Sequence, residues 1–248
     1  EITALNKLKM MTICSKCYYD NNYPEITFDK NNVCNYCIQI ESLANEYGTG
    51  REKGIKKFQQ IINEIKVNQK NKKYDCVVGV SGGTDSSYML HLLKEEYKLR
   101  VLAVHYDNTW NSAIATENIR KVLSALNVDL YTHVIDWDEY KNLMLAFFKS
   151  DVIDVELLYD NAMLGVNFTQ ALKHKTKFIL SGTNTSTEGM RIPKNWSWFK
   201  NDAKNIKYLG KKFMNQKLKT FPSYGTFDYI YCEFLNKIKW VTFLDYFD

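Results

Sequence analysis

The chain has 248 residues, of which 45% are hydrophobic, so it can bury the core of one α/β domain and carry a small additional module. No apolar run approaches the length of a membrane span, and residues 1–13 lack the apolar core of a signal peptide, so we expect a cytoplasmic protein without a membrane partner. The formal net charge of +5 arises in lysine-rich stretches with little arginine, which a solvated face explains without a nucleic-acid partner.

Four of the six cysteines form two Cys-x-x-Cys pairs, Cys14 with Cys17 and Cys34 with Cys37, separated by sixteen residues. This is the spacing of a zinc ribbon, in which each pair places two thiolates on one side of a tight turn. We expect a structural Zn²⁺ site, because four thiolates leave no coordination position for substrate, and a short strand at 26–28 between the pairs. A disulfide pair fits a cytoplasmic chain poorly, and a redox role is the minor alternative.

Residues 41–73 are polar with apolar residues at helical spacing, which predicts a connecting helix followed by a lysine-rich linker. From residue 74 onward, strand patterns alternate with helix patterns. The strands are expected at 74–80, 100–106, 129–135 and 176–181. The helices are expected at 84–97, 113–126, 138–150, 160–174 and 227–238. This alternation predicts a Rossmann-like α/β fold, a parallel sheet with helices on both faces.

The most informative segment is the loop after the first strand, Ser-Gly-Gly-Thr-Asp-Ser-Ser at 81–87. Its glycines let the backbone approach an anion or adopt a positive φ, and the helix that starts there favours negative charge. A lone carboxylate would repel phosphate, so we expect Asp85 to hold Mg²⁺ that bridges phosphate oxygens of ATP. Neither a Walker A motif nor GxGxxG is present, and the alternative is a turn that binds nothing. The expected phosphate contacts are Ser81, Gly82, Gly83, Thr84, Asp85, Ser86 and Ser87.

The second strand ends at the same edge of the predicted sheet as this loop, where the base and ribose of a nucleotide should lie. We expect the backbone of Val104, His105 and Tyr106 to contact adenine. His105 is interpreted as a structural histidine rather than a general base. Asp107, which follows directly, is the stronger catalytic candidate.

The loop resembles the SGGxDS signature of the pyrophosphate-loop ATPases, which have the adenine nucleotide alpha-hydrolase-like fold. The resemblance implies that ATP is cleaved between its α and β phosphates, that AMP passes to a substrate oxygen, and that the loop binds the leaving pyrophosphate. It also implies that Gly182 and Thr183 pack on the nucleotide and that Glu188 lies near metal or substrate. Arg191 and Lys194 either neutralise charge on a polyphosphate or acidic substrate or are ordinary surface cations.

The order of the parts resembles one family of these enzymes. Two Cys-x-x-Cys pairs with Pro24 and Asp29 between them precede a helix and the loop, and Phe-Asp-Tyr-Ile follows at 227–230. In these features residues 11–248 are similar to the N-acetyl sugar amidotransferases of bacterial lipopolysaccharide O-antigen and flagellin-glycan synthesis, whose members continue further, which implies a truncated C-terminus. The expected domains are an N-terminal extension with the zinc ribbon (1–40), a connecting helix and linker (41–73) and the pyrophosphate-loop ATPase domain (74–248).

The resemblance implies an ATP-dependent carbon–nitrogen ligase. Its substrate would be an N-acetylated, nucleotide-linked sugar, whose acetamido group becomes an acetamidino group with ammonia from a separate glutaminase subunit. No Ser-His-Asp or Cys-His set is apparent, and none is needed, because ammonia can displace AMP from the adenylated amide directly. The candidates for the group that deprotonates the incoming amine are Asp107, Asp160 and Glu188.

Two alternatives stay open. A tRNA-thiolating pyrophosphate-loop enzyme fits the cysteine pairs and the basic charge, but Cys76 and Cys232 lie in apolar segments where we expect them to be buried, and residues 151–165 contain no further cysteine pair. A zinc-ribbon module that binds ATP without turnover fits the motifs but leaves Asp85 without a role.

Overall fold

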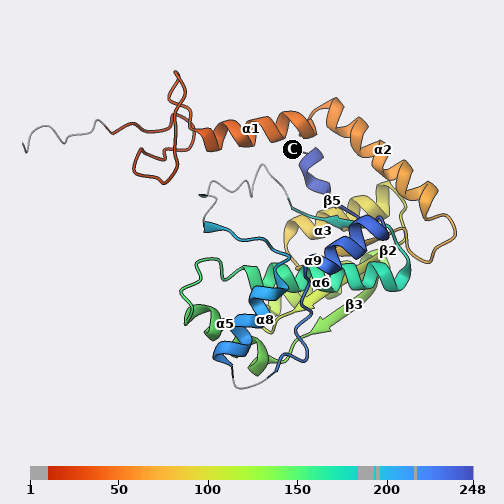
Figure 1. Ribbon diagram of the computed structural model, residues 1–248. Coiled ribbons are helices and arrows are strands. Elements are labelled where there is room, and N and C mark those ends of the chain that lie inside the picture. The colour runs from red at the N-terminus through yellow and green to blue at the C-terminus, as the bar shows by residue number, and fades with distance from the viewer. Residues whose placement is uncertain (1–10, 184–192, 194–195, 215–216, 248) are drawn as a thin grey trace, which may run out of the picture.

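The computed structural model describes residues 11–183, 193, 196–214 and 217–247, and within them five parallel strands form one sheet in the order β3-β2-β1-β4-β5 (Figure 1). The strands are β1 (Cys76–Gly79), β2 (Val101–Asp107), β3 (Asp129–Val134), β4 (Phe178–Ser181) and β5 (Lys239–Thr242). Helices cover both faces, so the predicted α/β class is confirmed. Because the chain moves outward from β1 to β3 and then returns to place β4 on the other side, the strand order reverses between β1 and β4.

Side chains of β1 alternate between two cores, as expected for a strand buried on both faces. Val77 belongs to one core, and Cys76 and Val78 belong to the other. The first core contains residues of α5 (Trp137–Phe148), α6 (Leu157–His174) and α8 (Ala203–Phe213). The second contains residues of α2 (Glu52–Asn68), α3 (Thr84–His91) and α4 (Ala113–Leu126).

The strands and helices predicted between residues 74 and 181 are confirmed, with small shifts of their ends. The predicted helix 84–97 is α3 continued by a π-helical turn, η2 (Leu92–Glu96), and the predicted helix 227–238 is α9 (Thr226–Tyr229) continued by η4 (Ile230–Leu235). Strand β5 and helix α8 were not predicted. In α8 the buried Ala203, Ile206 and Leu209 do recur at helical spacing, but lysines surround them in the sequence.

Two helices occupy the region before β1, where one was predicted. Helix α1 (Asn35–Tyr47) begins inside the second cysteine pair, and α2 follows after a sharp turn at Gly48, whose φ is +78°. A Cβ atom on Gly54 would lie 2.3 Å from the carbonyl oxygen of Gly48, so the turn requires glycine at both positions. The C-terminal turn η5 (Phe243–Tyr246) closes against it, where the Thr49 hydroxyl donates to the carbonyl of Asp245 at 2.6 Å (Figure 1).

The strand predicted at 26–28 is wrong. In its place the structure has isolated antiparallel bridges between Ile13 and Asp20 and between Phe28 and Cys34. The backbone around them is turn-like, with positive φ values at Glu25 and Asn32.

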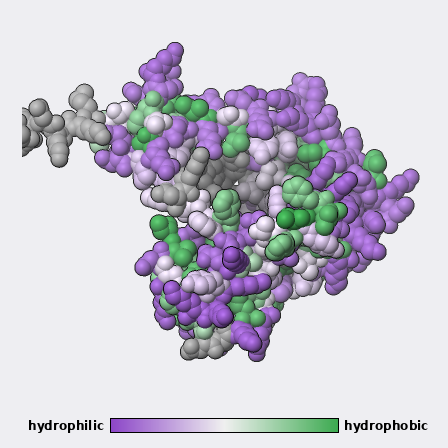
Figure 2. All heavy atoms as spheres, in the orientation of Figure 1, coloured by the Kyte–Doolittle hydropathy of each residue, from purple (hydrophilic) through white to green (hydrophobic). Residues whose placement is uncertain are grey.

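The surface is hydrophilic over α2 and hydrophobic over α9 and η4, as Figure 2 shows. The exposed apolar residues on that short helical segment include Phe227, Ile230, Phe234 and Leu235. Among the described residues, no helix is both long and apolar enough to cross a membrane.

Candidate nucleotide site and cysteine cluster

A cavity of about 230 Å³ opens at the carboxyl edge of the sheet, between the ends of β1 and β4. This is the position where the strand order reverses, at which open α/β sheets bind their ligands. The loop after β1, the turn after β4, two residues of β2 and one face of α6 line the cavity. Of the residues predicted to bind nucleotide, those that line it are Ser81, Gly83, Thr84, Asp85, Ser86, Val104, Tyr106, Gly182 and Thr183.

The loop at 81–87, the candidate phosphate loop, depends for its conformation on Gly82, which has a φ of +78°. A Cβ atom at this position would lie 2.3 Å from the carbonyl oxygen of Ala115 in the first turn of α4. The Asn118 side chain of the same helix donates to the Gly82 carbonyl at 3.2 Å. Gly82 therefore shapes the loop from behind rather than facing the cavity, whereas Gly83 is extended and caps α3.

Serine side chains hold the loop in place through the Gly83 carbonyl. Ser87 donates to it at 2.8 Å and Ser86 at 3.2 Å, and the Ser86 hydroxyl also lies 3.4 Å from that of Ser81. The first N–H groups of α3 have no partner inside the helix, and Asp85 and Thr84 stand beside them at the cavity wall. The arrangement can bind an anion with its backbone and a divalent cation with the Asp85 carboxylate.

His105 lies behind the cavity, consistent with a structural role. It is 7% exposed, and its Nδ1 donates to the carbonyl of Val80 at 2.8 Å. Asn111 bridges the far side of the ring to Asp107, with its Nδ2 3.1 Å from His105 Nε2 and 2.8 Å from Asp107 Oδ1. Asp107 also accepts from the backbone N–H of Thr109, so it orders the loop after β2 and does not line the cavity.

Two residues that line the cavity each carry a buried polar atom without a hydrogen-bond partner among the described residues: the hydroxyl of Tyr106 and Oδ1 of Asn167. Burial raises the pKa of Tyr106 far above its usual range. Asn167 is 2% exposed, and its Nδ2 donates to the Met163 carbonyl at 2.9 Å. A buried polar group without a partner requires a bound water, ion or ligand or a local strain to explain it, and these two could pair with a nucleotide. Asn167 was missed, although a polar residue on the buried face of a helix is a usable signal.

Other predicted residues fall elsewhere. Glu188 and Arg191 and Lys194 lie outside the described residues. Asp160 forms an ion pair with Lys200 at 2.9 Å, and Asp154 pairs with the same lysine at 2.8 Å. Both cysteines outside the two pairs are buried as predicted, and burial raises the pKa of the Cys76 and Cys232 thiols.

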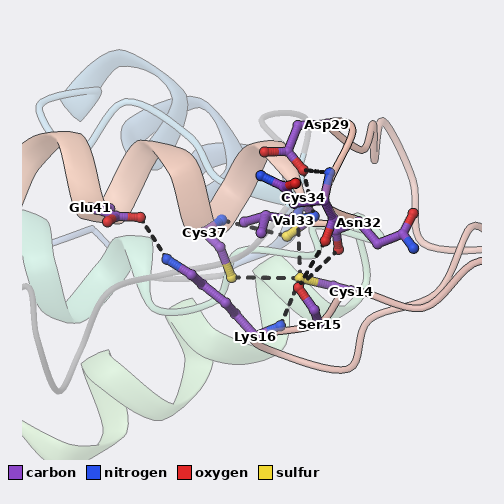
Figure 3. Close-up of polar contacts among 10 residues, drawn as sticks. Cys14, Ser15, Lys16, Asp29, Asn32, Val33, Cys34, Cys37 and Glu41 are labelled. Atoms are coloured by element: carbon purple, nitrogen blue, oxygen red, sulfur yellow. Dashed lines mark hydrogen bonds and ion pairs between the residues drawn. The ribbon is translucent and has the colours of Figure 1, made fainter.

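The four remaining cysteines come together into one cluster, of which Figure 3 labels Cys14, Cys34 and Cys37. Their sulfur atoms all lie within 4.8 Å of one another, with Cys14 and Cys37 3.9 Å apart and Cys17 and Cys34 3.6 Å apart. A tetrahedral ion with metal–sulfur bonds of about 2.3 Å requires sulfur separations of about 3.8 Å, so the cluster could bind a single metal ion.

Backbone N–H groups prepare one of these thiols to ionise. Burial raises the pKa of Cys14, but hydrogen bonds from the backbone of Cys17, Cys34 and Lys16 outweigh it and lower the pKa to about 6. The Lys16 N–H lies 3.4 Å from this sulfur and the Cys34 N–H 3.3 Å from it. Lys16 also pairs with Glu41 of α1 at 2.6 Å, which ties the first cysteine turn to the helix (Figure 3). At this position a thiolate is therefore available to a metal ion near neutral pH.

Comparison with known proteins finds similarity over the part of the chain that contains the loop after β1. A family model described as queuosine biosynthesis protein QueC matches residues 75–163, which hold β1, the phosphate loop, β2 and β3. An uncharacterised protein of Methanocaldococcus jannaschii is 32% identical over 118 residues, 47% of this chain and 40% of that protein. The tRNA(Ile)-lysidine synthase of Clostridium tetani is 32% identical over 83 residues, 31% of this chain and 18% of that protein.

This chain therefore spans less than half the length of either curated relative. Among solved structures, the NH3-dependent NAD synthetase of Campylobacter jejuni aligns with a TM-score of 0.41 at 17% identity, over 62% of this chain and 71% of that one. The QueC match covers the same loop whose geometry forms the cavity, and it includes the Asp85 position. Residues 75–163, about a third of the chain, are therefore similar to the QueC family of pyrophosphate-loop ATPases.

Proposed function

We propose that this chain is an ATP-dependent amidotransferase that converts the acetamido group of an N-acetylated sugar into an acetamidino group. The amide oxygen attacks the α-phosphorus of ATP, the bond to the β-phosphate breaks, and pyrophosphate leaves with the electron pair. Ammonia then adds to the activated carbon and loses a proton, and AMP departs with the former amide oxygen. The products are the amidine, AMP and pyrophosphate.

The observation that carries this proposal is the composition of the cavity wall. The phosphate loop and the turn after β4 meet there, with Asp85 between them, and no cysteine is among the described residues that line it. Adenylation followed by attack of ammonia needs an anion site and a metal, and it needs no covalent nucleophile on the protein. Sulfur transfer would call for a reactive thiol beside the activated oxygen.

The residues present fit Mg²⁺ and ATP. Asp85 offers a carboxylate beside the unpaired N–H groups of α3, and the bound ion would neutralise charge on the phosphate oxygens. The unsatisfied Asn167 Oδ1 can accept a hydrogen bond from an adenine amine, and Tyr106 can donate one. Gly82 and the serines keep the loop open for pyrophosphate.

The cysteine cluster would hold structural Zn²⁺ in this proposal. Three of its four thiols are buried, and four sulfur ligands complete a tetrahedral shell, so substrate would have no access to the ion. The ion would fix the turns at both cysteine pairs, which are too small to fold by burial alone. The sugar substrate and a separate glutaminase that supplies ammonia rest on the family resemblance.

The direct test incubates the protein with ATP, Mg²⁺, ammonium and a panel of acetamido nucleotide-sugars. Replacement of oxygen by NH lowers the product mass by about one unit, and AMP and pyrophosphate should form in equal amounts with it. Formation of ADP and orthophosphate, or an unmodified panel alongside sugar-independent AMP, would count against the proposal. Omission of ammonium is the control, since it should stop amidine formation.

A second candidate, a tRNA-thiolating enzyme, is favoured by one observation. Helix α8 exposes lysines along its solvent side, and the chain has a formal net charge of +5. These lysines are Lys204, Lys207, Lys211 and Lys212. Affinity for tRNA that falls steeply with salt and weakens when these residues are neutralised would favour this candidate. If the protein does not bind tRNA at physiological salt, the result would favour the amidotransferase.

A further inference from the structure

A second cavity, of about 650 Å³, lies on the same side of the sheet as α6 and has no role in the nucleotide chemistry described above. It lies between the residues that lead into α6 and the first turns of α8. Three aromatic side chains reach it, and all are substantially exposed: Trp196 is 40%, Trp198 53% and Tyr208 60% exposed. Large aromatic surfaces left open around a cavity mark a binding site more often than a packing accident.

Trp198 is held in position at two points. Its indole Nε1 donates to Asp202 Oδ2 at 2.7 Å, and its backbone N–H donates to Asp154 Oδ2 at 2.9 Å. The ring therefore keeps a fixed orientation while half of its surface stays uncovered. A preorganised aromatic face of this kind can stack on a flat apolar surface of a ligand with little loss of side-chain entropy.

The carboxylates around the cavity favour hydroxyl groups over charged ligands. Asp154 is neutralised by Lys200 at 2.8 Å, and Asp202 caps α8 by accepting from the Asn205 backbone N–H at 3.0 Å. Their remaining lone pairs can accept from hydroxyls. The lining also holds Asp151 and one cation, Lys204, so acids outnumber cations there, and a cationic ligand would find Asp154 already paired.

The cysteine cluster supports one wall of this cavity. Trp196 packs against Tyr23, with ring centroids 5.9 Å apart, and Tyr23 meets the edge of Tyr36 at 5.5 Å. Tyr36 is 6% exposed and lies next to Cys37 in α1. The N-terminal module, the segment at 11–37 with the four clustered cysteines, therefore contacts the α/β domain where Tyr23 packs against Trp196.

We propose that this cavity binds the pyranose ring of the acceptor sugar, with the apolar face of the ring stacked on Trp198 and its hydroxyls bonded to Asp154 and Asp202. This inference rests on the proposed function. Helix α6 borders both cavities on different faces, because Leu157 lines the second cavity and Tyr159, two residues further on, lines the nucleotide cavity.

Saturation-transfer NMR with uridine diphosphate N-acetylglucosamine and with ATP tests the site. In the wild-type protein, the pyranose protons should receive the strongest saturation of the nucleotide-sugar. The Trp198→Ala change should raise the dissociation constant of the sugar about tenfold and leave saturation of the ATP protons unchanged. Trp198→Phe retains a ring face without the N–H and should fall between the two. Phe227→Ala removes an exposed aromatic side chain that lines neither cavity and should match wild type.

The inferred sugar site and the proposed enzyme activity can be disproved independently of each other. If saturation falls on the uracil protons instead of the pyranose, or if Trp198→Ala binds as wild type does, the inference is overturned. If wild type forms the amidine and Trp198→Ala shows an unchanged KM for the sugar, the inference is overturned while the proposed function stands. If pyranose saturation depends on Trp198 and no acetamido sugar becomes an amidine, the inference stands and the proposed function falls. Unchanged ATP saturation confirms that each variant is folded.

Discussion

Gly82 and Ala115 approach so closely that a Cβ atom on the glycine would lie 2.3 Å from the alanine carbonyl oxygen. The contact locks the phosphate loop against the first turn of α4, and the φ of +78° at Gly82 adds a second requirement for glycine. The shape of the loop is therefore set by a helix that contributes no residue to the cavity lining.

Gly82→Ala should cost more than about 2 kcal/mol of unfolding free energy, because it combines a positive φ with a clash against backbone. It should also weaken ATP binding. Gly83→Ala is the matched control: Gly83 is extended, and its added Cβ would meet only the movable Ser81 hydroxyl at 3.3 Å. Thermal unfolding measures both variants, and equal stability of the two would contradict the proposed role of the Ala115 contact.

Asp85→Asn should leave the fold intact and abolish conversion of ATP to AMP, because the amide cannot replace the anionic ligand of Mg²⁺. Glu96→Gln is the control, because it removes a negative charge on the exposed surface of η2. This variant should convert ATP to AMP at the wild-type rate. Release of pyrophosphate is the readout. Turnover at the wild-type rate by Asp85→Asn would refute the assigned metal role.

Asn167→Leu should weaken ATP binding while it changes the stability of the unliganded protein little. The substitution removes a buried Oδ1 that has no partner among the described residues, so the unliganded protein should lose little stability or gain some. ATP should bind about tenfold more weakly if that oxygen accepts a bond from adenine. Gln170→Leu is the control, because Gln170 also has an unpartnered buried oxygen but does not line the cavity. Calorimetric titration that gives equal ATP affinity for both variants would rule out the adenine contact.

Cys14→Ser should remove the bound metal and loosen the N-terminal module while the sheet remains folded. Because Tyr23 of this module packs on Trp196, the variant should also weaken binding of sugar in the second cavity. Cys232→Ser alters a buried thiol outside the cluster and should retain the full metal content. Elemental analysis gives the metal content. A Cys14→Ser protein that keeps its metal would show that the cluster is not the site.

The parts of the fold and of the candidate site that depend on residues close together in the sequence could be predicted from it. The strand ending at Gly79 and the loop after it could be predicted because an apolar run, small residues and a helix start lie side by side in the sequence. Strand β5 could not, because it has four residues, its pattern is mixed, and it pairs with β4 some sixty positions earlier, as with Trp240 and Ile179. The false strand at 26–28 has β-branched residues, but the neighbouring cysteine turns determine the backbone there.

The two residues with unsatisfied polar groups in the nucleotide cavity also depend on contacts between distant parts of the sequence. Tyr106 was identified from its place at the end of a strand, although its buried hydroxyl was not. Asn167 comes from the middle of α6, and only the packing of that helix on β1 and β2 brings it beside the loop. A polar residue on the apolar face of this helix could have marked Asn167 in the sequence, but not its place beside the loop.

The most direct test of the central claim follows the oxygen of the acetamido group. A sugar labelled with ¹⁸O at that carbonyl is incubated with the protein, ATP, Mg²⁺ and ammonium, and AMP is analysed by mass spectrometry. Adenylation of the amide predicts that AMP gains the label, about two mass units, in equal amount to the amidine. Unlabelled AMP, or ADP with orthophosphate, would contradict the claim.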